Sequence, residues 1–227
     1  MAIRNFGASG GNFVITALLN FWFTPYLVGH LGVEAYGLVP LAMQVTSYMT
    51  LATLALNAAT SRFVMQAITQ EDHDKAARLF NTAVFATIGL VALLVIPAAY
   101  VAYNIANFIN VPESLYEDAR WLFIATFAAF LIGALRSPFE VSLFCRNRLD
   151  IQNGISALDT VVKVATTVLL CWLTYSSRGN VGVGIFAASL RTALLSVAAW
   201  RSLPSSLHID SGMWDKAMLK PLISVWR

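Results

Sequence analysis

The chain has 227 residues, of which 58% are hydrophobic and only 12% are charged, and its mean hydropathy is +0.66. Soluble domains usually carry about 25% charged residues, so the composition excludes an ordinary water-soluble fold and predicts a surface that faces lipid. The formal charge is +3, but basic and aromatic residues do not alternate as on nucleic-acid-binding surfaces, and we predict no nucleic-acid partner. Neither a zinc-ligand spacing nor a nucleophile or phosphate-loop motif occurs, so we predict no metal, no cofactor and no enzymatic activity.

Six apolar stretches follow one another along the chain and predict an all-α integral membrane protein, a six-helix transmembrane bundle over residues 1–203. Each stretch is long enough, with its flanks, to cross about 30 Å of hydrocarbon. Pro25 and Pro97 fall inside the first and third stretches, where membrane helices tolerate proline. The remaining residues, 204–227, are interpreted as a cytoplasmic or interfacial tail, or as the approach to a seventh helix. The expected spans are 13–28, 35–61, 79–112, 119–145, 152–175 and 181–200.

The distribution of Lys and Arg predicts that both ends of the chain lie in the cytoplasm. With this orientation 11 of the 15 basic residues fall on the inner side, and only Arg120 and Arg178 fall on the outer side. The positive-inside rule describes such an excess. In the polar inner segment before the third span, Thr69 followed by Asp72 resembles a capping box, so we expect Thr69 to cap the next helix.

Three ionisable residues lie inside the last two predicted spans: Asp159, Lys163 and Arg191. At 1.5 Å per residue, the two cations lie roughly 15 Å deep, near the bilayer midplane. A charge in contact with lipid there costs at least about 2.5–3.5 kcal/mol, so these side chains should face protein or a watery cavity. Asp159 precedes Lys163 by one helical turn, so the two can form an ion pair.

These three residues have two interpretations. In the first, Lys163 and Arg191 outnumber Asp159, and the net positive charge neutralises a phosphate-containing substrate during its crossing. In the second, Asp159 and Lys163 form a structural ion pair, and Arg191 bonds to backbone carbonyls. We favour the first for Arg191, which has no evident partner in the sequence, and leave the pair open.

Other polar residues in the spans are weaker candidates. Asn20, deep in the first span near Pro25, is predicted to line a polar path. Arg136 and Glu140 are spaced for an ion pair at the inner end of the fourth span, which we interpret as serving topology and headgroup contact. Hydrogen bonds between helices are expected for Asn12, Gln44, Asn57 and Asn81.

Three segments carry a pattern found in known transporters. They are FTPYLV at 23–28, LGVEAYGL at 31–38, which contains LG-x-x-x-YG, and KAARLF at 75–80. Together they resemble polysaccharide flippases of the O-antigen and teichoic-acid export type, in the MOP exporter superfamily. The resemblance extends over the whole chain in helix order.

The resemblance implies that an undecaprenyl-pyrophosphate-linked oligosaccharide is flipped across the bacterial cytoplasmic membrane by alternating access. Lys163 and Arg191 suit the pyrophosphate, and Asp159 and Asn20 complete the predicted substrate site. Family members have two lobes, so the chain resembles an N-terminal half, and its expected partner is a second six-helix lobe or a second copy. Two alternatives stay open: a MATE-type cation-coupled drug exporter, and a non-transporting membrane subunit that anchors glycan-assembly proteins.

Overall fold

The computed structural model describes residues 2–145, 149–173 and 180–201, and every regular element among them is helical. The predicted all-α class is confirmed. The first residue of each predicted span lies in a different long helix. The predicted tail, 204–227, lies outside the described residues. The elements are α1 (Ala2–Leu31), α2 (Val33–Thr69), α3 (His73–Tyr103), α4 (Ile105–Phe108), the 3₁₀ turn η1 (Glu113–Leu115), α5 (Tyr116–Cys145), α6 (Leu149–Leu173) and α7 (Asn180–Arg201).

The predicted number of spans holds approximately. In the described part, four helices are long and apolar enough to cross a membrane, and α2 makes a fifth if its two parts, bent by 47°, count as one span. The sixth predicted span corresponds to α7, whose apolar stretch is the shorter Ser189–Ala198. The third span is shorter than predicted, because α3 stops at Tyr103 and the Asn104 amide donates to the Tyr100 carbonyl at 2.9 Å.

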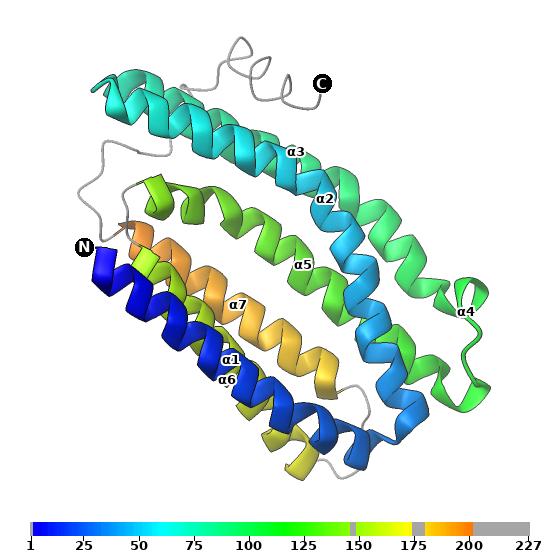
Figure 1. Ribbon diagram of the computed structural model, residues 1–227. Coiled ribbons are helices and arrows are strands. Elements are labelled where there is room, and N and C mark those ends of the chain that lie inside the picture. The colour runs from blue at the N-terminus through cyan, green and yellow to red at the C-terminus, as the bar shows by residue number, and fades with distance from the viewer. Residues whose placement is uncertain (1, 146–148, 174–179, 202–227) are drawn as a thin grey trace.

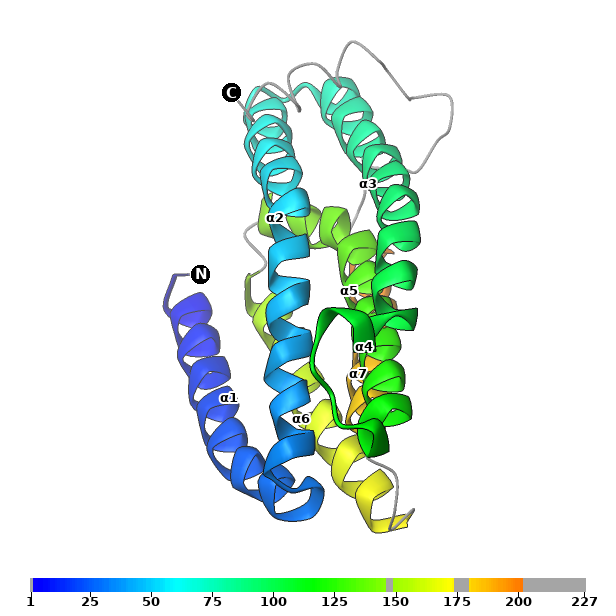
Figure 2. The same ribbon diagram turned by 90° about the vertical axis from the view of Figure 1, so that its right-hand side faces the viewer.

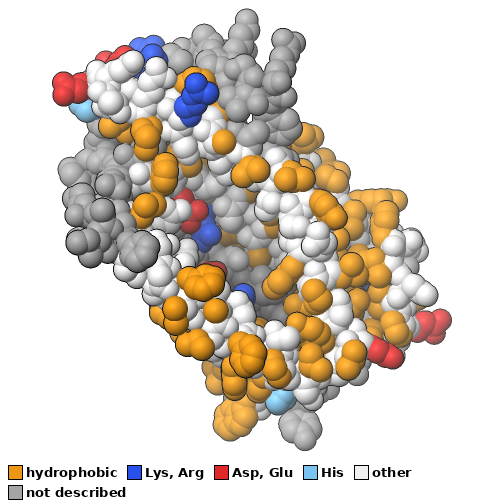
Figure 3. Space-filling model, viewed as in Figure 1, with side chains coloured by type: hydrophobic (Ala, Val, Ile, Leu, Met, Phe, Trp, Pro, Cys, Tyr) orange, Lys and Arg blue, Asp and Glu red, His pale blue; other side chains and the backbone are white. Residues whose placement is uncertain are grey.

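The helices form two groups joined along α5 and α7 (Figure 1). Helix α6 packs between α1 and α7, whereas α2 and α3 pack on each other and on α5. Helices α1 and α2 diverge from the turn that connects them, as Figure 2 shows. The face seen in Figure 3 is hollowed between α1 and α2, and acidic and basic side chains lie inside the hollow. A chain with so few charges therefore collects some of them in its interior.

Apolar side chains both build the core and cover the outside. The main core joins α1, α2, α3 and α5 around residues such as Phe23, Leu38 and Phe123, each at most 8% exposed. Many large apolar side chains stay outside, among them Phe21 at 84% and Trp172 at 77% exposure. Such an exterior suits lipid and would aggregate in water.

Buried threonines in the bundle satisfy their hydroxyls locally. Thr60, Thr87 and Thr126 each donate to the carbonyl four residues earlier, at distances of 2.7–2.8 Å. Such bonds let a helix carry polar side chains into an apolar environment without an unpaired donor. Asn57 makes the hydrogen bond between helices that was predicted for it: its Oδ1 accepts from the Ser137 hydroxyl of α5 at 2.9 Å.

The predicted cap of the third helix is wrong by three residues. Asp72 is the N-cap of α3, and its carboxylate accepts from the Lys75 backbone N–H at 3.0 Å. Thr69 is the last residue of α2, and its hydroxyl donates backwards to the Met65 carbonyl at 2.9 Å. The chain reverses after Thr69, at Glu71, which has a φ of 58°. The preceding helix therefore extends further than its apolar pattern indicates.

Gly32 sets the tight turn between α1 and α2. Its φ of 79° and ψ of 162° belong to a region that essentially only glycine adopts. Its N–H donates to the Val28 carbonyl, and its carbonyl accepts from the Tyr36 N–H, both at 3.0 Å. The glycine of the LG-x-x-x-YG pattern is thus required by the backbone, because one residue separates two antiparallel helices.

Replacing Gly32 by alanine should destabilise the protein by about 1–3 kcal/mol, the cost of a residue held in a disfavoured backbone region. An added Cβ would meet nothing within 4 Å at Gly32, so the loss comes from backbone strain alone. Gly37→Ala, in α2, is the matched control, because its Cβ also meets nothing and its φ is ordinary. Thermal unfolding in detergent measures both variants; equal midpoints would contradict the assignment.

Candidate functional site

Arg136 and Glu140 form the predicted ion pair on α5, with Nε and Oε1 3.2 Å apart. Their side chains are 23% and 21% exposed, so most of each lies inside the bundle. The Arg136 Nε–H forms no hydrogen bond with any described residue, so its contact with Glu140 is an ion pair without a hydrogen bond. The interpretation as a headgroup contact is therefore replaced by an internal charge pair.

Asp159 and Lys163 lie on α6, one turn apart, and face α7. The Thr192 hydroxyl of α7 donates a short hydrogen bond to Asp159 Oδ1. Thr192 is 2% exposed, so this bond is sealed between the two helices. Lys163 is partly buried and feels the Asp159 charge, but no close ion pair joins the two among the described residues. Asp159 therefore accepts a hydrogen bond from a residue of the neighbouring helix instead of forming the direct ion pair with Lys163 that the spacing allows.

The two sets of charges form one cluster. The Glu140 carboxylate interacts electrostatically with Arg136 on its own helix and with Asp159 on α6. Glu140 and Asp159 bring two negative charges, and Arg136 and Lys163 bring two positive ones. Each helix carries one charge of each sign, so the cluster is neutral in sum, although the interaction of Glu140 with Asp159 is between like charges. Its place in the interior explains how a membrane lobe carries four ionisable groups.

Thr192→Val should destabilise the protein by about 1.5–3 kcal/mol, because the Asp159 carboxylate loses a charge-assisted hydrogen bond while the side-chain shape is kept. Thr167→Val is the control: Thr167 is also buried, but its hydroxyl donates to the Lys163 carbonyl on its own helix. The free energy of unfolding in detergent compares the two, and a loss for Thr192→Val no larger than the control's would refute the role of the bond.

The other two predicted site residues stand apart from this cluster. Arg191 is exposed on α7, on the same face as Leu190 and Leu194, and has no partner among the described residues. It points about 100° away from Thr192, the next residue along the helix. Asn20 is exposed on α1 and likewise has no bond to the cluster within the described ranges. The structure thus brings together Asp159 and Lys163, but not Arg191 or Asn20.

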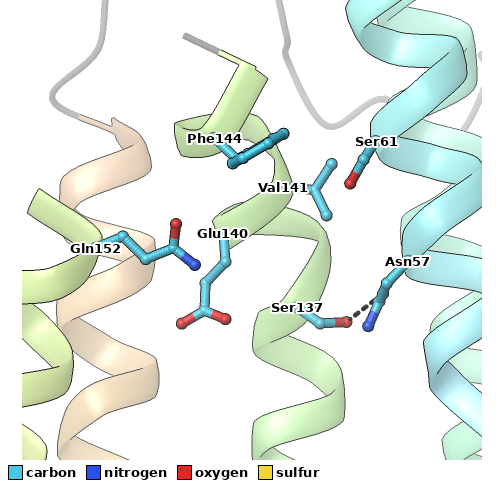
Figure 4. Close-up of a pocket in the computed structure, with 7 residues that line it drawn as sticks. All are labelled: Asn57, Ser61, Ser137, Glu140, Val141, Phe144 and Gln152. Atoms are coloured by element: carbon cyan, nitrogen blue, oxygen red, sulfur yellow. Dashed lines mark hydrogen bonds between the residues drawn. The ribbon is translucent and has the colours of Figure 1, made fainter. Parts of the chain in front are cut away.

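A polar pocket adjoins the cluster between the second half of α2, the last turns of α5 and the start of α6 (Figure 4). Its volume is about 280 Å³, and Glu140 belongs both to the pocket and to the charge cluster. The Oε1 atom of Gln152 is buried and has no hydrogen-bond partner among the described residues. The lining residues are Asn57, Ser61, Ser137, Glu140, Val141, Phe144 and Gln152.

The family model described as MatE matches residues 10–169. The chain belongs to the MatE family. The matched region contains Arg136, Glu140, Asp159 and Lys163, and it ends before Thr192 and Arg191. Membership in this family of transporters agrees with the prediction that the chain is not an enzyme.

The chain is similar to individual proteins that are longer than it is. The uncharacterized membrane protein EpsK of Bacillus subtilis (strain 168) is 32% identical over 166 residues, which make up 73% of this chain and 33% of EpsK. The outward-facing conformation of a multidrug resistance MATE family transporter of the MOP superfamily covers 97% of the chain, with a TM-score of 0.80 and 15% identity. The Vibrio cholerae MATE transporter VcmN in its bent form also covers 97%, with a TM-score of 0.74 and 15% identity.

These matches establish a multi-pass membrane fold. The chain spans about a third of EpsK and about half of each solved transporter, 49% and 51% of their chains. At such low identity, the likeness to the solved structures concerns the fold alone. The predicted resemblance to one lobe of a MOP-type transporter is confirmed at this level.

Sequence reasoning missed two residues of the candidate site, Thr192 and Gln152. Thr192 was overlooked because a buried threonine looks like any other small residue of an apolar helix; its position beside Arg191 was the available signal. Gln152 was used only to mark the start of a span. A polar residue two positions after Asp150, at the start of a span, gives no sign that it faces Glu140, which lies on another helix (Figure 4).

Proposed function

We propose that the chain is one lobe of a flippase for lipid-linked oligosaccharides, in which Lys163 and Arg191 meet the pyrophosphate of the substrate. One observation carries the proposal: neither cation is held in a close ion pair within the described residues, although both lie in helices of a membrane lobe. A cation in such a place requires water or an anion, because contact with lipid is costly. A pyrophosphate supplies both charge and hydrogen-bond acceptors.

The charge balance also supports an anionic substrate. The cluster of Arg136, Glu140, Asp159 and Lys163 is neutral, so the surplus positive charge of the two last helices is that of Arg191, which stands apart on α7. Transporters built from repeats place their substrate between the repeats. The proposal therefore needs a second six-helix lobe, or a second copy of the chain, to close the substrate path and allow alternating access.

Deletion in the source strain tests the function. Without the protein, surface glycan should disappear and lipid-linked precursor should accumulate in the inner leaflet, and a plasmid copy should restore both. Susceptibility to cationic drugs should not change. Normal surface glycan in the deletion strain, with no precursor accumulation, would contradict the flippase proposal.

A MATE-type drug exporter is the second candidate, favoured by one feature of the site. Asp159 is an acid within a membrane helix, and the Thr192 hydroxyl orients its carboxylate, as a site for a cation or a cationic drug would need. Asp159→Asn keeps the shape and removes the charge. Under this alternative the substitution raises drug susceptibility and leaves surface glycan unchanged; under the flippase proposal drug susceptibility stays as it was.

A further inference from the structure

The pocket between α2, α5 and α6 has the chemistry of a neutral ligand site. Its carboxylate, Glu140, is paired with Arg136 at 3.2 Å, so the pocket carries no net charge. A metal ion would need uncompensated oxygen charge, and a phosphate would need an uncompensated cation. Both ions are therefore disfavoured, whereas a neutral ligand rich in hydrogen-bonding groups is not.

The hydrogen-bonding groups around the pocket are mixed donors and acceptors. The Asn57 and Gln152 amides, the Ser61 and Ser137 hydroxyls and the Glu140 carboxylate converge on one space (Figure 4). Sugar hydroxyls donate and accept at once, so amides and carboxylates suit them. Gln152 Oε1 is a buried acceptor that no described residue satisfies, and a ligand hydroxyl could bond to it once the amide turns toward the pocket.

The volume of the pocket and an aromatic side chain at its edge further restrict the class of ligand. At about 280 Å³, the pocket lies at the lower limit for small-molecule sites and fits a single ring. Phe144 lines it and is 43% exposed, which leaves an aromatic surface free to cover the C–H face of a ring. The site lies at the end of the bundle that we predict to be cytoplasmic, where a lipid-linked substrate would enter.

We propose that this pocket binds one pyranose ring of the transported glycan and thereby selects substrates by their sugar. The inference rests on the proposed function: Glu140 belongs to both the pocket and the charge cluster, so a sugar bound there would sit beside the cluster that contains Lys163. Gln152 is the specificity-determining residue, and Phe144 provides the stacking surface.

Binding to the full protein in lipid nanodiscs tests the pocket with three probes: lipid-linked oligosaccharide extracted from the source strain, undecaprenyl pyrophosphate without sugar, and the free oligosaccharide. The wild type should prefer the glycosylated lipid over the bare lipid about tenfold, the effect of one or two hydrogen bonds. Gln152→Leu and Phe144→Ala should each erase that preference and leave affinity for the bare lipid intact. Gln44→Leu and Phe21→Ala, at exposed positions outside the pocket, should keep the preference.

The outcomes separate this inference from the proposed function. If the wild type binds both lipids equally, or if Gln152→Leu retains the tenfold preference, the sugar pocket is refuted and the flippase proposal stands. If the wild type binds neither lipid, the proposed function fails, and the pocket inference fails with it. Binding of the free oligosaccharide that Gln152→Leu weakens would support a sugar site that does not need the lipid.

Discussion

Export of surface glycan should fall about 10- to 100-fold when Lys163 or Arg191 is replaced by alanine. Each substitution removes a charge-assisted contact to the pyrophosphate, worth about 1.5–3 kcal/mol, and 1.4 kcal/mol corresponds to a factor of ten. Because the two cations lie on different helices, α6 and α7, we expect each to contribute its own contact, and the double variant should be inactive. The measurement is the rate at which surface glycan reappears in the deletion strain at matched protein levels.

Charge-preserving and remote substitutions provide the controls. Lys163→Arg should retain most export, because it keeps the charge while changing the head group. Arg78→Ala removes an exposed cation of α3 outside the cluster and should leave export unchanged. Full export from both Lys163→Ala and Arg191→Ala, with normal protein levels, would show that neither cation contacts the substrate.

The second large effect concerns stability and arises from the Arg136–Glu140 pair. Arg136→Met should destabilise the protein by about 3 kcal/mol, because it leaves the Glu140 carboxylate inside the bundle without its cation. The remaining charge also lies in the field of Asp159, a second acid. For a chain of this size the loss corresponds to a fall of roughly 6–12 °C in the unfolding temperature. Thermal unfolding in detergent micelles measures it.

A double substitution separates loss of the pair from loss of packing. Arg136→Met combined with Glu140→Leu removes both charges and should recover most of the stability, since a buried ion pair is often replaceable by apolar residues. Glu117→Gln is the control, because Glu117 is 79% exposed in its contact with Arg120 and should change stability little. If the double variant is no more stable than Arg136→Met alone, the unpaired Glu140 carboxylate is not the cause of the destabilisation.

Hydropathy was sufficient to predict the helices of this lobe, but not which helices pack against each other. Apolar length and the absence of charge located each span, because every crossing needs about the same length of helix. The start and the end of α3 depend on Asp72 and Asn104, single polar side chains whose local bonds outweigh the apolar pattern. Which helices pack together depends on side-chain fit, and an apolar pattern does not contain that information.

In the candidate site, likewise, the sequence could predict a contact within one helix but not the contacts between helices. The i,i+4 spacing correctly paired Arg136 with Glu140, because both residues belong to one helix. The same spacing left the Asp159–Lys163 pair open, and Thr192, 33 residues further on, supplies the hydrogen bond that Asp159 accepts. The pocket combines residues of three helices, so only the packed structure reveals it.

Water access to positions 163 and 191 tests the central claim most directly, that the two cations line a wet, substrate-facing cavity. In a background with Cys145 and Cys171 replaced by alanine, Lys163→Cys and Arg191→Cys are treated with a membrane-impermeant thiol reagent, with Ile96→Cys on α3 as the control expected to face lipid. The account predicts that both cysteines react, that added lipid-linked oligosaccharide protects them, and that position 96 stays unreactive. Two cysteines as unreactive as position 96, with or without the lipid, would contradict it.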